Sequence, residues 1–279
     1  MRRRSFVVGL LFAATFLSSC ATFVRRETGF LDRSVTIGSQ TYRYQVYVPA
    51  EWHAGKKWPV ILFLHGAGER GSDGLLQTDV GLPHAIRVRS ANVPAVVVMP
   101  QCRAERTWNS PDMQTLALKA LDAAVREFDG DTQRLYATGL SMGGYGTWEL
   151  AAAHPGLFAA YAVVCGGMRP PKGYPDIRNS LVDDPSVPDP YAALGRRIGA
   201  APVWIFHGDA DPVVPVEEAR RVYAALKPSD ANARLTEYPG VGHDSWLKAY
   251  AEPDFFSWLL AQHLSPRLLK VGGGQGGQN

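Results

Sequence analysis

The sequence predicts an α/β protein with a mostly parallel central sheet, helices on both faces of that sheet, and an antiparallel hairpin at its N-terminal edge. Short apolar runs alternate with segments of helical periodicity along the chain, which is the pattern of a parallel sheet. Residues 59–64 and 95–99 are continuous apolar runs, as expected of strands that helices cover on both faces. Residues 34–38 and 42–48 instead alternate apolar and polar residues around a glycine turn, which predicts the edge hairpin.

The remaining elements follow in chain order. Ser110, Pro111 and Asp112 begin a helix with a hydroxyl cap, a proline in the first position and an acid in the first turn. An apolar stripe at helical spacing carries this helix to Phe128, and Gly130 ends it. Further strands are predicted at 134–138, 158–164, 203–207 and 234–238. Further helices are predicted at 143–153, 216–226 and 245–263.

The chain has 279 residues, of which 46% are hydrophobic, and this favours one sizeable domain over two small ones. We place the domain at residues 34–264, after a tether at 20–33. The glycine- and glutamine-rich tail at 265–279 is expected to be disordered.

Residues 1–19 are predicted to be a signal peptide, because three arginines precede an apolar run that is too short to span a bilayer comfortably. The run ends in Leu17-Ser18-Ser19-Cys20, which resembles the lipobox of bacterial lipoproteins, where the cysteine becomes the first mature residue and carries lipid. This resemblance implies an exported protein with a lipid anchor at Cys20. Because Ala21 rather than aspartate follows, it also implies the outer membrane of a Gram-negative bacterium. An ordinary signal peptide that contains a cysteine is the alternative.

The formal net charge of +3 does not indicate a nucleic-acid partner. Arg2, Arg3 and Arg4 supply three positive charges, and all three lie in the expected leader. The mature chain therefore carries no excess charge, and no nucleic acid is expected to bind it.

A candidate nucleophile is Ser141, in the motif Gly139-Leu140-Ser141-Met142-Gly143. A buried strand is predicted before this motif and a helix after it. Small residues two positions before and after a serine permit a sharp strand-to-helix turn, which lifts the hydroxyl clear of the sheet. The helix N-terminus also directs its free N–H groups towards any nearby anion. A plain tight turn is the alternative reading.

A serine needs a base to remove its proton and an acid to orient that base. Asp211 is the expected acid, because its loop follows a predicted strand and reaches towards the serine, whereas Asp209 sits nearer the strand and is expected to shape the turn. His243 is the expected base, because it lies on a glycine-rich loop after the last strand and after the acid. His65 and His207 each precede a glycine at a strand end, where an imidazole often braces a loop. The remaining histidines are His53, His84, His154 and His263.

The oxyanion of an acyl-transfer intermediate needs two backbone N–H donors. One comes from the residue after the nucleophile, which is Met142, and the other from the loop after the earlier strand, which is Ala67. The neighbouring Glu69 and Arg70 are expected to form an ion pair that stiffens this loop, and a direct catalytic role for Glu69 is the alternative. No clustered set of cysteine and histidine ligands is present, so neither a metal nor a cofactor is expected.

Five motifs in order resemble the phospholipase/carboxylesterase-like branch of the α/β-hydrolases, whose members are often labelled predicted peptidases. The motifs are His65-Gly66-Ala67-Gly68-Glu69-Arg70-Gly71, Pro100-Gln101-Cys102 with Trp108, the Ser141 motif extended to Gly144, Cys165-Gly166-Gly167, and His243-Asp244-Ser245-Trp246. Acetyl xylan and feruloyl esterases and secreted polyhydroxybutyrate depolymerases are neighbours of this branch. The resemblance covers residues 40–262 and implies an α/β-hydrolase fold. The proline-rich stretch at 169–190 lies outside it and is expected to be a surface excursion over the active-site face.

We therefore expect a serine hydrolase that cleaves carboxylic esters through an acyl-enzyme, with short acyl groups preferred, such as acetyl or feruloyl groups on polysaccharide. Trp108 and Trp246 lie near the expected site and could stack on a sugar or phenolic ring, or could be packing residues. Cys102 and Cys165 could pair or pack as small apolar residues. The alternative functions are a serine peptidase and a lipoprotein that binds a ligand without catalysis. The sequence does not indicate an oligomeric state.

Overall fold

The computed structural model describes residues 27–89, 93–229 and 232–264. The expected signal peptide, Cys20 and the expected tail lie outside these residues. Within them, no helix is long and apolar enough to cross a bilayer.

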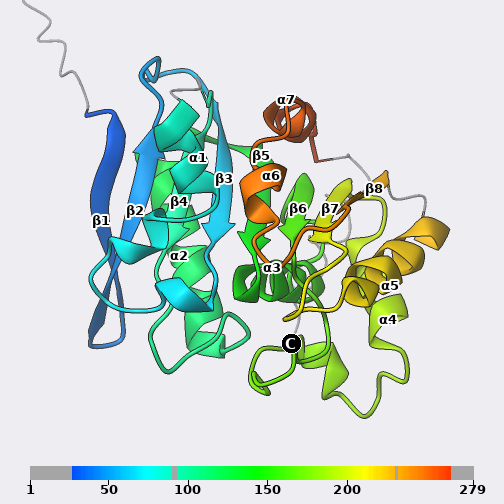
Figure 1. The fold of residues 1–279 in the computed structure, drawn as a ribbon. Coiled ribbons are helices and arrows are strands. Elements are labelled where there is room, and N and C mark those ends of the chain that lie inside the picture. The colour runs from blue at the N-terminus through cyan, green and yellow to red at the C-terminus, as the bar shows by residue number, and fades with distance from the viewer. Residues whose placement is uncertain (1–26, 90–92, 230–231, 265–279) are drawn as a thin grey trace, which may run out of the picture.

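One eight-stranded sheet forms the centre of the molecule (Figure 1), in the order β1-β2-β4-β3-β5-β6-β7-β8. β1 pairs antiparallel with β2, and β2 pairs antiparallel with β4, while every other neighbouring pair is parallel. The strands are β1 Gly29–Ile37, β2 Gln40–Val48, β3 Trp58–Leu64, β4 Val96–Pro100, β5 Gly130–Leu140, β6 Ala160–Val164, β7 Val203–Gly208 and β8 Ala233–Tyr238. The predicted parallel sheet with an antiparallel edge hairpin is confirmed.

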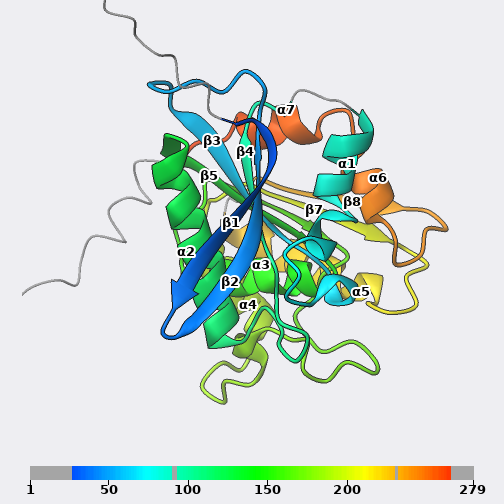
Figure 2. The same cartoon turned by 90° about the vertical axis from the view of Figure 1, so that its left-hand side faces the viewer.

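The helices cover both faces of this sheet, as Figure 2 shows for α2 and α1 on opposite sides. They are α1 Leu82–Arg89, α2 Pro111–Glu127, α3 Met142–Ala153, α4 Pro190–Ile198, α5 Val216–Leu226, α6 Trp246–Ala249 and α7 Phe255–Leu260. Side chains of β3 alternate between two cores: Val60 and Leu62 pack in the core with residues of α2 to α5, and Ile61 and Phe63 in the core with residues of α1, α6 and α7. All four are fully buried, which explains why this strand is apolar throughout.

Two sequence predictions about elements need correction. The closing helix predicted at 245–263 is two short helices, α6 and α7, because Pro253 lies between them and cannot donate an N–H to a continuous helix. Residues 29–33, expected to belong to the tether, are the first part of β1 and pair with β2 up to Val48. The structure also adds α1 and α4, which the sequence reading missed.

A local signal could have revealed α4. Asp189 caps this helix, since its side chain accepts hydrogen bonds from the N–H groups of Tyr191 and Ala192, and Pro190 occupies the first helical position.

Candidate active site

Ser141 lies in the sharp turn between β5 and α3. Its backbone has φ 51° and ψ −121°, a left-handed conformation that strains a residue with a side chain. The turn also requires glycine on both sides. A Cβ added at Gly143 would overlap the carbonyl oxygen of Leu64, and one added at Gly139 would overlap the carbonyl group of Gly143. The spacing of the two glycines around Ser141 is thus a packing requirement of this elbow.

Three side chains from separate loops form a chain of hydrogen bonds at this elbow. Nε2 of His243 lies 2.8 Å from Oγ of Ser141, and Nδ1 of His243 lies 2.7 Å from Oδ2 of Asp211. Asp211 follows β7 and His243 follows β8. Because parallel strands end at the same edge of a sheet, both loops reach the edge at which β5 presents Ser141. The structure therefore brings together the three residues that the sequence singled out.

The Asp211 side chain is fully buried, yet its charge is well supported. Burial by itself would raise the pKa of Asp211. Four hydrogen bonds outweigh this effect of burial and hold the pKa of Asp211 well below its usual value. They come from His207, from His243, and from the N–H groups of Val213 (2.8 Å) and Val214 (3.0 Å). Asp211 is thus a carboxylate that only accepts hydrogen bonds, as an acid that orients a histidine must be.

Asp209 has a different position and role. Its Oδ1 accepts a hydrogen bond of 2.7 Å from the N–H of Gly240, which ties the loop after β7 to the loop after β8. The side chain is exposed and makes no contact with His243 among the contacts that the structure describes. Asp209 therefore shapes the turn, as the sequence indicated.

His207 is a residue of the site whose contact with the acid the sequence reading missed. Its Nε2 lies 2.9 Å from the carbonyl oxygen of Val214 and 3.3 Å from Oδ2 of Asp211. Since a carbonyl oxygen can only accept, Nε2 carries the proton. His207 thus braces a loop, as expected, and also contacts the acid. The strand-end position suggested the first role, but no sequence signal distinguished the second.

The loop after β3 lies against the elbow and supplies Ala67. Gly66, Ala67 and Ser141 line one pocket, and a Cβ added at Gly66 would lie 3.7 Å from the Cβ of Ser141. Met142 is the first residue of α3, where an N–H has no acceptor within the helix. Both expected oxyanion donors therefore belong to segments that border Ser141.

The predicted ion pair between Glu69 and Arg70 does not form among the described residues. Nε of Arg70 instead donates to the carbonyl oxygen of Ala67 at 3.0 Å. Burial raises the pKa of Glu69, although hydrogen bonds from the backbone of Gly66 and of Glu69 itself lower it in part. Each of the two side chains thus contacts the backbone of the loop rather than the other side chain.

His65 and Trp108 support this loop from below. The N–H of Cys102 donates to Nε2 of His65 at 2.9 Å, so the proton lies on Nδ1, which is 2.6 Å from the carbonyl oxygen of Gly66. Burial lowers the pKa of His65 to about 4, which keeps the ring neutral. Nε1 of Trp108 donates to the carbonyl oxygen of His65 at 2.9 Å. Trp108 is only 1% exposed, so of the two alternatives that the sequence left open it is a packing residue and does not stack on substrate.

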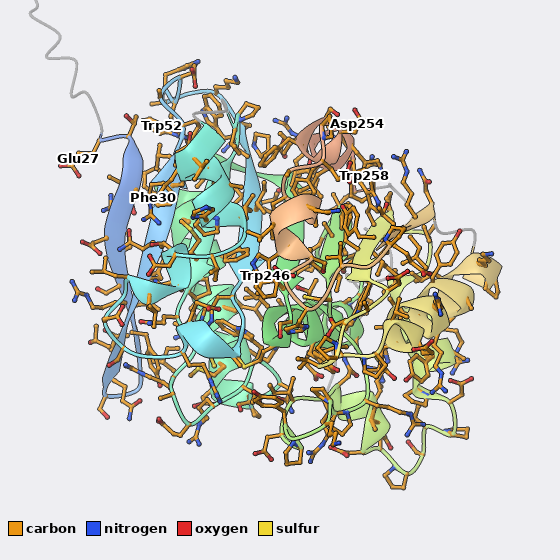
Figure 3. All side chains as sticks on the ribbon, viewed as in Figure 1. Glu27, Phe30, Trp52, Trp246, Asp254 and Trp258 are labelled. Atoms are coloured by element: carbon orange, nitrogen blue, oxygen red, sulfur yellow. The ribbon has the colours of Figure 1, made fainter. Side chains whose placement is uncertain are left out.

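Trp246 does lie at the site. It lines the same pocket as Ser141, and its ring meets that of His243 edge to face, with the centroids 5.6 Å apart. Figure 3 shows Trp246 at the beginning of α6, near the middle of the sheet. This pocket has a volume of about 250 Å³ and is lined by Tyr174 and Ile177 from the proline-rich stretch. That stretch therefore lies over the site, as the sequence indicated.

The two cysteines in the described part of the chain are free and buried. Burial raises the pKa of Cys102 to about 12 and the pKa of Cys165 further still, so both remain protonated thiols. They pack as small apolar residues, and of the two alternatives the disulfide is excluded.

Proteins similar to this chain include some that are named as esterases. A protein of Nocardia uniformis subsp. tsuyamanensis named "Putative esterase NocK" is 30% identical over 66% of this chain and 49% of its own length. A "Putative carboxymethylenebutenolidase" of Salmonella typhimurium is 32% identical over 48% of this chain and 45% of its own length. An "Uncharacterized secreted protein" of Arthroderma benhamiae is 27% identical over 84% of this chain and 27% of its own length. This chain thus spans half or less of these three relatives.

Solved structures share the fold. A thermostable esterase superposes with a TM-score of 0.69 at 30% identity, over 84% of this chain and 63% of the other. A ferulic acid esterase gives 0.64 at 17% identity, over 82% and 98%. An acylaminoacyl peptidase of Pyrococcus horikoshii gives 0.63 at 17% identity, over 85% and 43%. At these two lower identities the likeness concerns the fold alone. The sheet order and the similarity to the thermostable esterase at 30% identity establish the α/β-hydrolase fold.

The family model described as "Putative esterase" matches residues 34–245, which include the elbow, Asp211 and His243. Since the match covers most of the chain, this protein belongs to that esterase family of α/β-hydrolases.

Proposed function

We propose that the protein hydrolyses carboxylic esters through a serine-linked acyl-enzyme, with Ser141, His243 and Asp211 as the catalytic residues. The observation that carries this proposal is the hydrogen-bond chain from Oγ of Ser141 through His243 to the buried carboxylate of Asp211. The esterase family supports the class of reaction. A protein that only binds a ligand would not need a strained serine aligned with a histidine and a buried acid.

The proposed mechanism follows from the position of each group. Nε2 of His243 accepts the proton of Ser141 as Oγ attacks the ester carbonyl, and the charge of Asp211 stabilises the imidazolium that results. The N–H groups of Ala67 and Met142 stabilise the oxyanion. His243 then gives its proton to the departing alcohol. A water molecule, activated by the same base, hydrolyses the acyl-enzyme.

The size of the pocket favours short acyl groups. Its volume of about 250 Å³ is below the roughly 300–1,000 Å³ of typical small-molecule sites. Tyr174 and Ile177 wall it on the side of the proline-rich stretch. Acetyl groups carried on polysaccharide are the proposed natural substrates, and the larger, aromatic feruloyl group is the alternative acyl group. Trp246 lines the pocket and offers an aromatic face to either substrate.

A series of p-nitrophenyl esters tests the proposal. The wild-type protein is expected to cleave acetyl to butyryl esters faster than longer ones and to prefer esters strongly over a peptide amide. Ser141→Ala should lower kcat on the order of 10⁴-fold or more while the circular dichroism spectrum stays that of the wild type. Near-wild-type turnover by this variant would refute the serine mechanism. Amide cleavage within about tenfold of the best ester would reassign the protein as a peptidase.

We also propose that the protein is exported and anchored by lipid at Cys20, in the outer membrane. The leader sequence supports export and the anchor. The similarity to a secreted protein of Arthroderma benhamiae supports export alone. Cys20→Ser should abolish incorporation of a labelled fatty acid and release the protein from the membrane fraction. Label in this variant would contradict the anchor.

A further inference from the structure

A second pocket lies beside the catalytic pocket. The two share Tyr174 and Ile177 as lining residues, and the second has a volume of about 470 Å³ against about 250 Å³. Its lining is polar, unlike the wall around Ser141. The side chains that matter are Arg70, Glu105, Arg106, Asn109, Asp176 and Arg178.

The wall between the two pockets is the loop of residues 168–179. The N–H of Asn179 donates to the carbonyl oxygen of Met168 at 2.9 Å, which closes the loop at its neck. Ile177 is buried, whereas Tyr174 is 46% exposed. Because Tyr174 lines both pockets, it lies at the boundary between them.

Two carboxylates hold this loop in place. Glu218 of α5, only 7% exposed, accepts hydrogen bonds from the N–H groups of Met168 (2.8 Å) and Arg169 (3.0 Å). Glu149 of α3, also 7% exposed, accepts from the N–H (2.8 Å) and the hydroxyl (2.6 Å) of Ser180. Hydrogen bonds to charged groups are among the stronger ones in proteins, so the wall is preformed rather than assembled around a ligand.

Three arginines and two acids line the second pocket, and each arginine already has a partner. Arg70 donates to the carbonyl oxygens of Ala67 and Arg106, so its donors are engaged with the backbone. Arg106 pairs with Asp112 at 3.1 Å, and Arg178 pairs with Asp183. Glu105 and Asp176 form no ion pair among the described residues, so they remain available as acceptors. The guanidinium N–H groups that these contacts leave over supply donors to the same space.

This set of donors and acceptors selects the kind of ligand. A sugar hydroxyl both donates and accepts, so it can use both sets of groups. A carboxylate ligand would face the charges of Glu105 and Asp176, and an alkyl chain would desolvate polar groups without replacing their hydrogen bonds. The exposed ring of Tyr174 offers an apolar face of the kind that packs against a sugar ring.

We propose that this second pocket is a binding subsite for an uncharged, hydroxyl-rich group, a sugar unit adjacent to the unit whose ester is cleaved at Ser141. The proposal rests on the ester hydrolase function proposed above. It assigns Glu105 and Asp176 as acceptors for the hydroxyl groups, and Tyr174 as the residue over which the substrate passes from one pocket to the other.

The double variant Glu105→Ala/Asp176→Ala tests this assignment, since neither residue lines the catalytic pocket. Kinetics are measured on acetylated xylo- and cello-oligosaccharides of about two to four units and on p-nitrophenyl acetate, which is too small to reach the subsite. KM for the oligosaccharide esters should rise about tenfold, while kcat/KM for p-nitrophenyl acetate should stay within about twofold. Glu51→Ala, which removes an exposed acid outside both pockets, is the matched control and should change neither.

A binding measurement separates the subsite from catalysis. In a Ser141→Ala background, calorimetry with the same oligosaccharide esters should show about tenfold weaker binding when Glu105 and Asp176 are replaced, and weaker binding with Tyr174→Ala. If the wild type cleaves p-nitrophenyl acetate but the double variant leaves both KM and binding unchanged, the subsite is refuted and the esterase function stands. If the wild type cleaves no ester, the ester hydrolase function and the subsite are both refuted.

Discussion

Replacing Asp211 with asparagine should nearly abolish ester hydrolysis without removing the carbonyl-type oxygen that the loop needs. In the structure, Oδ1 accepts from the N–H groups of Val213 and Val214, and Oδ2 faces Nδ1 of His243 and Nε2 of His207. Asparagine can keep its oxygen at the Oδ1 position. Its NH₂ group must then face two ring nitrogens where Asp211 offered an acceptor.

The consequence for the base follows directly. The amide N–H can be satisfied by His243 only if Nδ1 becomes an acceptor, which places the ring proton on Nε2, facing Ser141. In that tautomer His243 cannot remove the serine proton. The expected loss in kcat is on the order of 10⁴-fold, equivalent to about 5.4 kcal/mol of transition-state stabilisation.

The assay is p-nitrophenyl acetate hydrolysis, with Asp209→Asn as the matched control. Asp209 accepts a single hydrogen bond, from the N–H of Gly240, which an asparagine oxygen can also accept. The control should therefore retain activity within about threefold, since the loss of one exposed charge has a small effect. A larger loss in Asp209→Asn than in Asp211→Asn would overturn the assignment of the acid.

Three further outcomes are expected. Burial lowers the pKa of His65 to about 4, so the neutral ring contributes stability that is present above the ordinary pKa of 6.5 and is lost as pH falls towards 4. Between pH 7 and pH 5, the free energy of unfolding measured in urea should therefore fall less in His65→Gln than in the wild type. Equal decreases would contradict this. Trp108→Ala should lower the free energy of unfolding by about 3–5 kcal/mol, whereas Trp246→Ala should mainly raise KM, and thermal melts with ester kinetics distinguish the two. Gly143→Ala should cost about 1–3 kcal/mol or prevent folding, because its Cβ overlaps a backbone carbonyl, and an unchanged melting temperature would show that the elbow can relax.

Local sequence patterns determined most of the fold and the core of the candidate site. β3, β4, β6 and β7 are short, mostly apolar runs, because helices cover both faces of the sheet there, and this signal is readable from the sequence alone. β8, at the edge of the sheet, carries more polar residues and is only partly buried. The elbow at Ser141 is also local, because its two glycines are required by the turn itself. Asp211 and His243 could be predicted because loops that follow parallel strands lie at the same edge of the sheet.

Tertiary structure decided what depends on contacts between distant segments. Trp108 could have faced substrate or core, and its hydrogen bond to the His65 carbonyl, 43 residues away in sequence, places it in the core. Glu69 and Arg70 are adjacent in sequence, but each finds a backbone partner instead of the other, since only the folded loop brings those groups within reach. The position of Tyr174 between the two pockets likewise depends on the hydrogen bonds that Glu218 and Glu149 make to the loop of residues 168–179 and to Ser180. No periodicity in the sequence encodes where these two acids lie relative to that loop.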